Sequence, residues 1–211
     1  MSYLVVSSLA ELPATVASHG AQDLVTLINA DTQVDRPAGI APDRHLFLGF
    51  NDIAEPIEGL TAPTVDHLDQ LLEFGTRWRR DTPLAVHCWA GISRSTAAAY
   101  ILALSINPDL QEEALANELR RRAPSATPNP RLVALADDKL QRGGRMVSAI
   151  RAIGRGEDAF SGTPFVLPLT SGSLSPAACR RGRGPGSCGC APRRHSPRWP
   201  GWRPRRARRS A

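Results

Sequence analysis

Residues 83–96 read Pro-Leu-Ala-Val-His-Cys-Trp-Ala-Gly-Ile-Ser-Arg-Ser-Thr, and they combine a short apolar run, a loop with one glycine and the beginning of an apolar helix. The run at 83–87 predicts a buried strand, and the Ala- and Leu-rich residues 95–106 predict a helix that is buried on most sides. A loop wound against a helix N-terminus directs successive backbone N–H groups inward. We therefore expect the loop that begins at Cys88 to form a cradle for an anion.

The alternation of strands and helices continues on both sides of this segment. Short aliphatic runs predict further strands at 3–6, 24–28 and 44–48. Apolar residues at helical spacing predict helices at about 8–19, 65–78, 108–122, 130–141 and 145–153, with Thr64 placed to cap the second of them. Strands that alternate with helices usually form parallel sheets covered on both faces. We expect an α/β domain whose central, mostly parallel sheet has about four to five strands flanked by helices.

Length and charge limit the class of protein. The chain has 211 residues, 42% of them hydrophobic and 22% charged, which suits one domain with a proper core rather than two. All 20 acidic residues lie at or before Asp158, whereas 11 of the 26 basic residues lie in 171–211. Residues 1–170 therefore hold 15 basic and 20 acidic side chains, a net charge of −5, and the overall charge of +6 comes from the C-terminal residues.

The expected domain covers residues 1–158, and residues 159–211 form an Arg-, Pro- and Gly-rich tail. The tail has too few apolar residues to offset the entropy lost on ordering, so we expect disorder there. Three interpretations stay open: a plain appendage, a tether to nucleic acid or a membrane surface, and translation of an altered reading frame. We favour the last, because Lys139 is the only lysine and the tail has the composition that GC-rich DNA gives out of frame. Contact of the tail with nucleic acid is the less favoured interpretation.

Cysteine usage and hydropathy indicate a cytoplasmic protein. Cys88 is the only cysteine before the tail, which holds Cys179, Cys188 and Cys190, so the domain has no partner for a disulfide. The N-terminal residues read as a strand rather than as a signal peptide. No apolar run approaches the roughly 20 residues that span a bilayer, so we expect no membrane contact. No cluster has the spacing of a metal site, and we expect neither a metal ion nor another cofactor.

The loop between the predicted strand and helix can perform nucleophilic chemistry on a phosphate. Arg94 offers a planar fork for two phosphate oxygens, and Cys88 lies at the start of the loop, beneath the anion's central atom. Ser95 can donate its hydroxyl to the sulfur, and His87 can orient the loop and favour a negative sulfur. We expect catalytic roles for these four residues. The expected phosphate-binding residues are Trp89, Ala90, Gly91, Ile92, Ser93 and Arg94.

The segment resembles the Cys-x5-Arg signature of the protein tyrosine phosphatase superfamily, His-Cys-x-x-Gly-x-x-Arg-Ser/Thr. Its inner part, Ala-Gly-Ile-Ser-Arg-Ser, most resembles the dual-specificity branch, and the whole is similar to small bacterial tyrosine-phosphatase-like proteins. Asn129 matches the Pro-Asn that begins a late helix in that branch, although Leu132 stands where the branch has Phe. The resemblance implies a dual-specificity phosphatase-like fold. It also implies hydrolysis of phosphotyrosine, and of phosphoserine or phosphothreonine, in a protein or peptide through a phosphocysteine intermediate.

The resemblance further implies a general acid, an Asp on a loop after an earlier strand, that protonates the leaving oxygen. Asp52 fits this position, because it follows the predicted strand at 44–48 and precedes Cys88 by 36 residues. Asp31, Glu55 and Glu58 are the alternatives.

Two other functions stay open on the sequence. One has the same chemistry on a phosphoinositide or an RNA 5′-phosphate; positions 89, 90, 92 and 93 are not basic, which argues against so highly charged a substrate. The other is a phosphopeptide-binding module with little turnover. Trp89 is either a platform beside the substrate or a packing residue, and Asn129 is expected to cap a helix rather than touch substrate. Arg120–Arg122 is expected to be a solvated helix end. The sequence does not indicate an oligomeric state.

Overall fold

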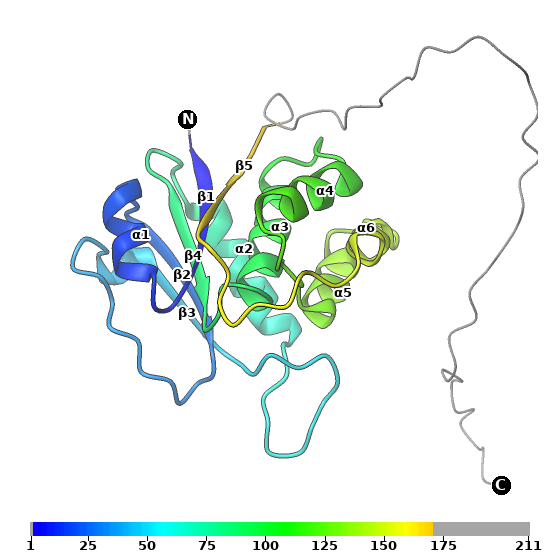
Figure 1. Ribbon diagram of the computed structural model, residues 1–211, viewed down its shortest axis with the longest axis horizontal. Coiled ribbons are helices and arrows are strands. Elements are labelled where there is room, and N and C mark those ends of the chain that lie inside the picture. The colour runs from blue at the N-terminus through cyan, green and yellow to red at the C-terminus, as the bar shows by residue number, and fades with distance from the viewer. Residues whose placement is uncertain (1, 171–211) are drawn as a thin grey trace, which may run out of the picture. The chain divides into compact units, whose positions relative to one another are not determined.

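The computed structural model describes residues 2–170, and Figure 1 shows them as a sheet with helices on both faces. The sheet has five strands in the order β3-β2-β4-β1-β5. Their bounds are β1 Tyr3–Ser8, β2 Asp23–Ile28, β3 His45–Gly49, β4 Leu84–Cys88 and β5 Phe165–Pro168. Strands β1 to β4 pair in parallel, and only β5 is antiparallel, to β1. The prediction of an α/β domain with a mostly parallel sheet is confirmed.

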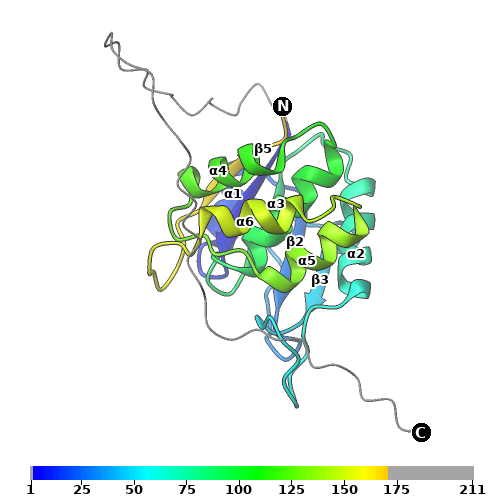
Figure 2. The same cartoon turned by 90° about the vertical axis from the view of Figure 1, so that its right-hand side faces the viewer.

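The helices are divided unequally between the two faces of the sheet. One face carries α1, Leu12–His19, and the other carries the remaining helices (Figures 1 and 2). These are α2 Val65–Arg77, α3 Arg94–Ile106, α4 Glu112–Arg122, α5 Pro130–Lys139 and α6 Arg145–Ile153, while Pro42–Arg44 form one 3₁₀ turn before β3. Side chains alternate along each strand, so Val86 faces the larger core with α3, and its neighbour Ala85 faces the smaller core with α1.

Helix α3 lies at the centre of the larger core. Its residues 97–104 are all 0% exposed, and Figure 2 shows α6 and α5 in front of it. The three consecutive alanines at 97–99 have small side chains, which let neighbouring elements pack closely against this helix. The predicted buried helix is confirmed. The cap at Thr64 is also confirmed, because its hydroxyl accepts from the His67 N–H and the His67 ring accepts from the Thr64 N–H.

Two helices begin later than the sequence indicates. Helix α1 starts at Leu12, because Ser8 remains in β1 and its hydroxyl accepts the Glu11 N–H (3.3 Å) in a turn before the helix. Helix α4 starts at Glu112, because residues 107–110 form a turn closed by the bond from the Leu110 N–H to the Asn107 carbonyl (3.2 Å). In both cases a local hydrogen bond takes the place of the first helical turn.

The predicted domain end at residue 158 is too early. Strand β5 follows it and pairs with β1, and Phe165 and Leu167 are buried in the larger core. The four residues Phe165–Pro168 are flanked by Gly, Pro and Ser. This composition is typical of a disordered tail, so the sequence did not predict a strand there. The rest of the predicted tail, residues 171–211, lies outside the described residues. Within 2–170, no helix is both long enough and apolar enough to cross a bilayer.

Candidate active site

The predicted strand–loop–helix unit is present, and it lies at the edge where the four parallel strands end. Cys88 is the last residue of β4, and Arg94 is the first residue of α3. Gly91 in the loop between them has φ +72°, and a Cβ there would lie 2.8 Å from the Ser7 carbonyl carbon and from the Ser8 nitrogen. The end of β1 therefore holds the loop so closely that only glycine fits.

Outward-facing carbonyls give this loop its inward-facing amides. Four loop carbonyls accept backbone N–H groups from outside the loop or from the first turn of α3. These bonds run from Leu9 to Trp89 (3.1 Å), Gly162 to Ala90 (2.8 Å), Thr127 to Ile92 (2.9 Å) and Ala97 to Ser93 (3.0 Å). In a trans peptide the following N–H points the opposite way, so the amides of residues 90, 91, 93 and 94 are directed to the concave side. We refer to residues 88–94 as the phosphate loop.

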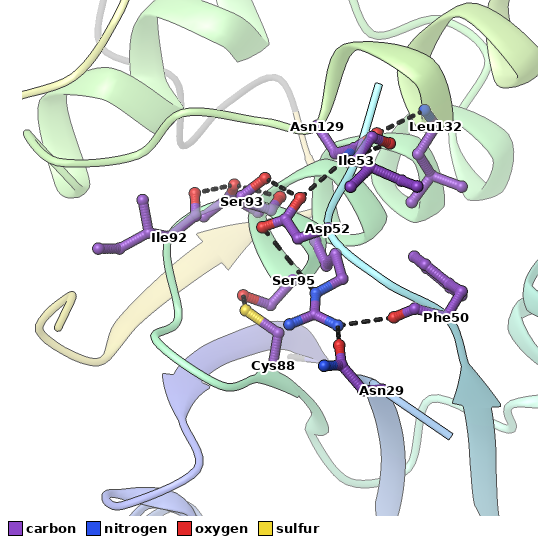
Figure 3. A network of polar contacts seen from close by, with 12 residues as sticks. Asn29, Phe50, Asp52, Ile53, Cys88, Ile92, Ser93, Ser95, Asn129 and Leu132 are labelled. Atoms are coloured by element: carbon purple, nitrogen blue, oxygen red, sulfur yellow. Dashed lines mark hydrogen bonds and ion pairs between the residues drawn. The ribbon is translucent and has the colours of Figure 1, made fainter. Parts of the chain in front are cut away.

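The sulfur of Cys88 lies inside this loop. Its Sγ is 3.1 Å from the Ser95 hydroxyl oxygen and 3.3 Å from the Gly91 nitrogen, which donates to it. Figure 3 shows the sulfur and the Ser95 hydroxyl pointing toward one another. Cys88 is 2% exposed and Ser95 is 0% exposed. The Gly91 N–H, a Ser95 hydroxyl placed to donate and the nearby N-terminus of α3 can all stabilise negative charge on this sulfur.

Arg94 is held so that part of its guanidinium stays available. Its Nη1 donates to Asn29 Oδ1 (2.9 Å) and to the Phe50 carbonyl (2.7 Å), which anchors the side chain between the ends of β2 and β3. Its Nε is buried and has no hydrogen bond within residues 2–170. An unpaired buried donor costs about 1–3 kcal/mol, so a bound anion that accepts from this nitrogen would be stabilised. Asn29 and Phe50 carry no motif that sequence reasoning could have used.

Asp52 lies beside the phosphate loop and is fixed from two sides. Its Oδ1 accepts from the Ser93 hydroxyl (2.7 Å) and from Asn129 Nδ2 (2.8 Å), and its Oδ2 is 3.9 Å from Arg94 Nε. Figure 3 shows Asp52 between Ser93 and Asn129. The predicted cap at Asn129 is confirmed, because its Oδ1 accepts the Leu132 N–H (3.0 Å). The same side chain therefore caps α5 and positions the carboxylate.

The three alternatives to Asp52 lack such contacts. Asp31, Glu55 and Glu58 are exposed, and none makes a hydrogen bond or ion pair within the described part of the chain. The structure thus brings one carboxylate into contact with the phosphate loop and with Arg94, and it is the carboxylate that the spacing favoured.

His87 braces the phosphate loop as a neutral ring. It is 0% exposed, and its Nε2 is 2.7 Å from the hydroxyl oxygen of Thr26, which in turn is 2.8 Å from His45 Nε2. Burial lowers the pKa of His87 to about 4, and the cations of His45 and Arg94 act in the same direction. His87 therefore adds no positive charge beside the sulfur at neutral pH. Of the two roles expected from the sequence, orienting the loop fits this geometry.

The buried His87 makes folding stability depend on pH. The unfolded chain takes up a proton near pH 6.5, but the folded chain does so only near pH 4, so stability falls as the pH drops through this window. We expect a loss of roughly 3 kcal/mol from this residue between pH 7 and pH 4. Denaturant titrations at several pH values measure it. The variant His87→Gln should lose less stability over the same interval; equal slopes for both proteins would contradict the assignment.

Replacing Gly91 by Ala should destabilise the domain and open the phosphate loop. The new Cβ would meet β1 backbone at 2.8 Å, and the residue would also be held at positive φ. We expect a loss of about 2–4 kcal/mol in the free energy of unfolding. The matched control is Gly59→Ala, since Gly59 has φ +78° but no atom within 4 Å of its Cβ position. Equal losses for the two variants would show that the contact with β1 does not matter.

Two other predicted positions have definite outcomes. Trp89 is 59% exposed, so it is not a packing residue. The expectation of a solvated helix end is wrong for Arg120, which donates to the carbonyls of Pro124 and Gly154, because the turn after α4 and the end of α6 converge on it.

Within residues 2–170, no group of three or more His, Cys, Asp or Glu side chains is placed to hold a metal ion.

Known structures share this fold. DUSP15 superimposes with a TM-score of 0.54 at 16% identity, over 72% of this chain and 94% of that one. The PTP-2 phosphatase of Cydia pomonella superimposes with a TM-score of 0.50 at 21% identity, over 64% of this chain and 83% of that one. No protein-family model matches the chain, and no curated protein matches it in sequence. The chain therefore has the dual-specificity phosphatase-like fold that the resemblance implied.

Proposed function

We propose that this chain is a cysteine-dependent phosphatase that hydrolyses phosphotyrosine, and also phosphoserine or phosphothreonine, in proteins or peptides. One observation carries the proposal: a sulfur that contacts the Gly91 N–H and the Ser95 hydroxyl lies in a loop of inward-facing amides, next to a buried guanidinium whose Nε has no hydrogen bond within residues 2–170. Such a loop suits a tetrahedral dianion, whose oxygens accept from the amides and from Arg94. The phosphorus atom would then lie above Cys88.

The first chemical step transfers the phosphoryl group to sulfur. The Cys88 thiolate attacks phosphorus, an S–P bond forms, and the bond from phosphorus to the leaving oxygen breaks. Asp52 donates its proton to that oxygen as the bond breaks.

The second step restores the free enzyme. Asp52, now a carboxylate, removes a proton from a water molecule as the water attacks phosphorus. The S–P bond breaks, inorganic phosphate leaves, and the sulfur returns to the thiolate. Ser95 stabilises this leaving sulfur with its hydroxyl, 3.1 Å away. The cycle uses only groups of this chain and water.

The charge of the loop supports a substrate with a single phosphate. Among residues 88–94 only Arg94 is charged, whereas a polyanionic phosphoinositide or RNA end would benefit from further cations. The loops after β2 and β3 add Asp31, Asp35, Glu55 and Glu58 against one Arg36. A phosphorylated protein or peptide in the cytoplasm is therefore the proposed substrate.

The test is a search for the intermediate itself. A phosphotyrosine peptide is hydrolysed in the presence of EDTA, the reaction is quenched in acid, and peptides containing Cys88 are examined by mass spectrometry. We expect turnover in EDTA and a phosphate group on Cys88. Turnover that requires added metal, or a phosphate group on a residue other than Cys88, would contradict the proposal.

A second candidate, a phosphopeptide-binding module with little turnover, is favoured by the contacts of Asp52. Ser93 and Asn129 both donate to its Oδ1, and its Oδ2 is paired with Arg94, so the carboxyl group would have to give up a contact to reach a leaving oxygen. Comparing the turnover number with the affinity for the same phosphotyrosine peptide distinguishes the two. Tight binding with turnover no faster than in Cys88→Ser would favour the module.

A further inference from the structure

A row of polar side chains crosses the sheet beneath the phosphate loop. His87 on β4 pairs in register with Ser7 on β1 and with Thr26 on β2, and these three side chains share one face. His45 on β3 pairs with Leu24, two residues before Thr26, and so lies on the same face. This face is otherwise apolar and is covered by α1. Polar groups buried in such a layer normally have a defined hydrogen-bonding arrangement.

The central member of the row can donate to only one neighbour. The Thr26 oxygen is 2.7 Å from His87 Nε2 and 2.8 Å from His45 Nε2, but a hydroxyl carries one proton. If Thr26 donates to one ring, the other ring must donate to Thr26. In a third arrangement both rings donate to the oxygen, and the Thr26 proton then needs another acceptor. The tautomer of His87 therefore decides which arrangement is present.

The surroundings of His87 favour one direction. Its Nδ1 is buried and has no hydrogen bond within residues 2–170, and the adjacent backbone of Cys88 raises the pKa of the ring against the larger, opposite effect of burial. Nε2 already faces Thr26, so Nδ1 is the nitrogen that can carry a proton toward the backbone. Nε2 of His87 then accepts from Thr26, and Thr26 accepts from His45 Nε2–H.

We propose that Thr26 and His45 are positioning residues that act through His87 on the nucleophile. The chain from His45 Nε2–H through the Thr26 hydroxyl to His87 Nε2 holds His87 as the Nδ1–H tautomer. That tautomer keeps an N–H toward the backbone of Cys88 and so fixes the direction of its sulfur. His45 has an Nε2 proton both as a neutral donor and as a cation, so the chain keeps its direction when His45 titrates. The effect on turnover rests on the proposed function; the tautomer does not.

The first measurement is the tautomer of His87, read from two-bond ¹H–¹⁵N couplings in the full chain without substrate. The parent should show Nδ1–H. Thr26→Val keeps the shape of the side chain but removes the hydroxyl, and should populate the Nε2–H form. Thr26→Ser keeps a hydroxyl and should return the parent spectrum. An Nε2–H tautomer in the parent, or an unchanged tautomer in Thr26→Val, would overturn the proposal.

The second measurement is turnover of a phosphotyrosine peptide. Loss of the hydroxyl leaves a buried ring nitrogen unpaired, so kcat of Thr26→Val should fall about tenfold with KM within about twofold of the parent. His45→Phe, which leaves Thr26 in place, should show a smaller loss, and Thr26→Ser should match the parent. If the parent turns over through Cys88 and Thr26→Val has the same kcat, the inference fails while the proposed function stands.

The matched control is Thr15→Val. Thr15 is buried in α1, the helix that covers the same face of the sheet, and no hydrogen bond joins it to His45, Thr26 or His87. It removes a buried hydroxyl by the same substitution and should keep the parent tautomer and kcat. A tautomer change in Thr15→Val would show that any loosening of this layer alters His87, and would remove the specific role of Thr26. A parent that lacks turnover but shows Nδ1–H would reject the proposed function and leave the hydrogen-bonded chain intact.

Discussion

Replacing Cys88 by Ser is expected to reduce kcat for a phosphotyrosine peptide by at least about 10³-fold. The serine hydroxyl is almost entirely protonated near neutral pH, so the donors from Gly91 and Ser95 have no anion to stabilise. The same amides and Arg94 remain in place for the phosphate. Affinity for the peptide should therefore stay within about tenfold of the parent, since most contacts to a bound dianion come from the backbone.

Steady-state kinetics and calorimetry on the same preparation measure these two quantities. The control is Cys179→Ser, which also removes one sulfur but is not among the residues to which the proposal gives a role; its kcat should equal that of the parent. Residual turnover of Cys88→Ser near the parent level would mean that another group attacks phosphorus. Loss of both binding and thermal stability would point instead to a collapsed phosphate loop.

Replacing Asp52 by Asn is expected to lower kcat by about 10²–10⁴-fold on phosphotyrosine or an alkyl phosphate. Asn keeps an oxygen that can accept from Ser93 and Asn129, so the loop geometry is preserved while the transferable proton is lost. A phosphate ester with a good leaving group needs little protonation. On such a substrate the loss should be within about tenfold.

The dependence on the leaving group is the decisive measurement for Asp52. Parent and variant are compared over a series of aryl phosphates of increasing leaving-group basicity, and only the variant should slow steeply along the series. Glu55→Gln is the matched control, because Glu55 is on the same loop and makes no hydrogen bond or ion pair within the described residues. If Asp52→Asn hydrolyses an alkyl phosphate at the parent rate, the general acid is another residue.

The phosphate loop could be predicted because its parts are neighbours in the sequence. A strand that ends at Cys88, a glycine three residues on and an arginine that opens a helix are local features, and backbone geometry then directs the amides inward. The alternation of strands and helices likewise predicted the parallel sheet, since residues buried on both faces of a strand leave a continuous apolar run. Strand β5 was not predicted from the sequence, because its four residues lie among Gly, Pro and Ser.

The contacts that complete the site could not be predicted from the sequence. Asn29 and Phe50 hold Arg94, and Thr26 and His45 support His87, only because β2 and β3 lie beside β4 in the order β3-β2-β4-β1-β5. That order results from pairing between segments far apart in the chain, from Thr26 with His87 to Tyr3 with Pro168, and no local pattern specifies it. Spacing left four candidates for the general acid, and the tertiary contacts selected Asp52. Neighbouring residues in the sequence thus determined the candidate nucleophile and the loop around it, whereas the packing of distant strands decided which side chains hold them in position.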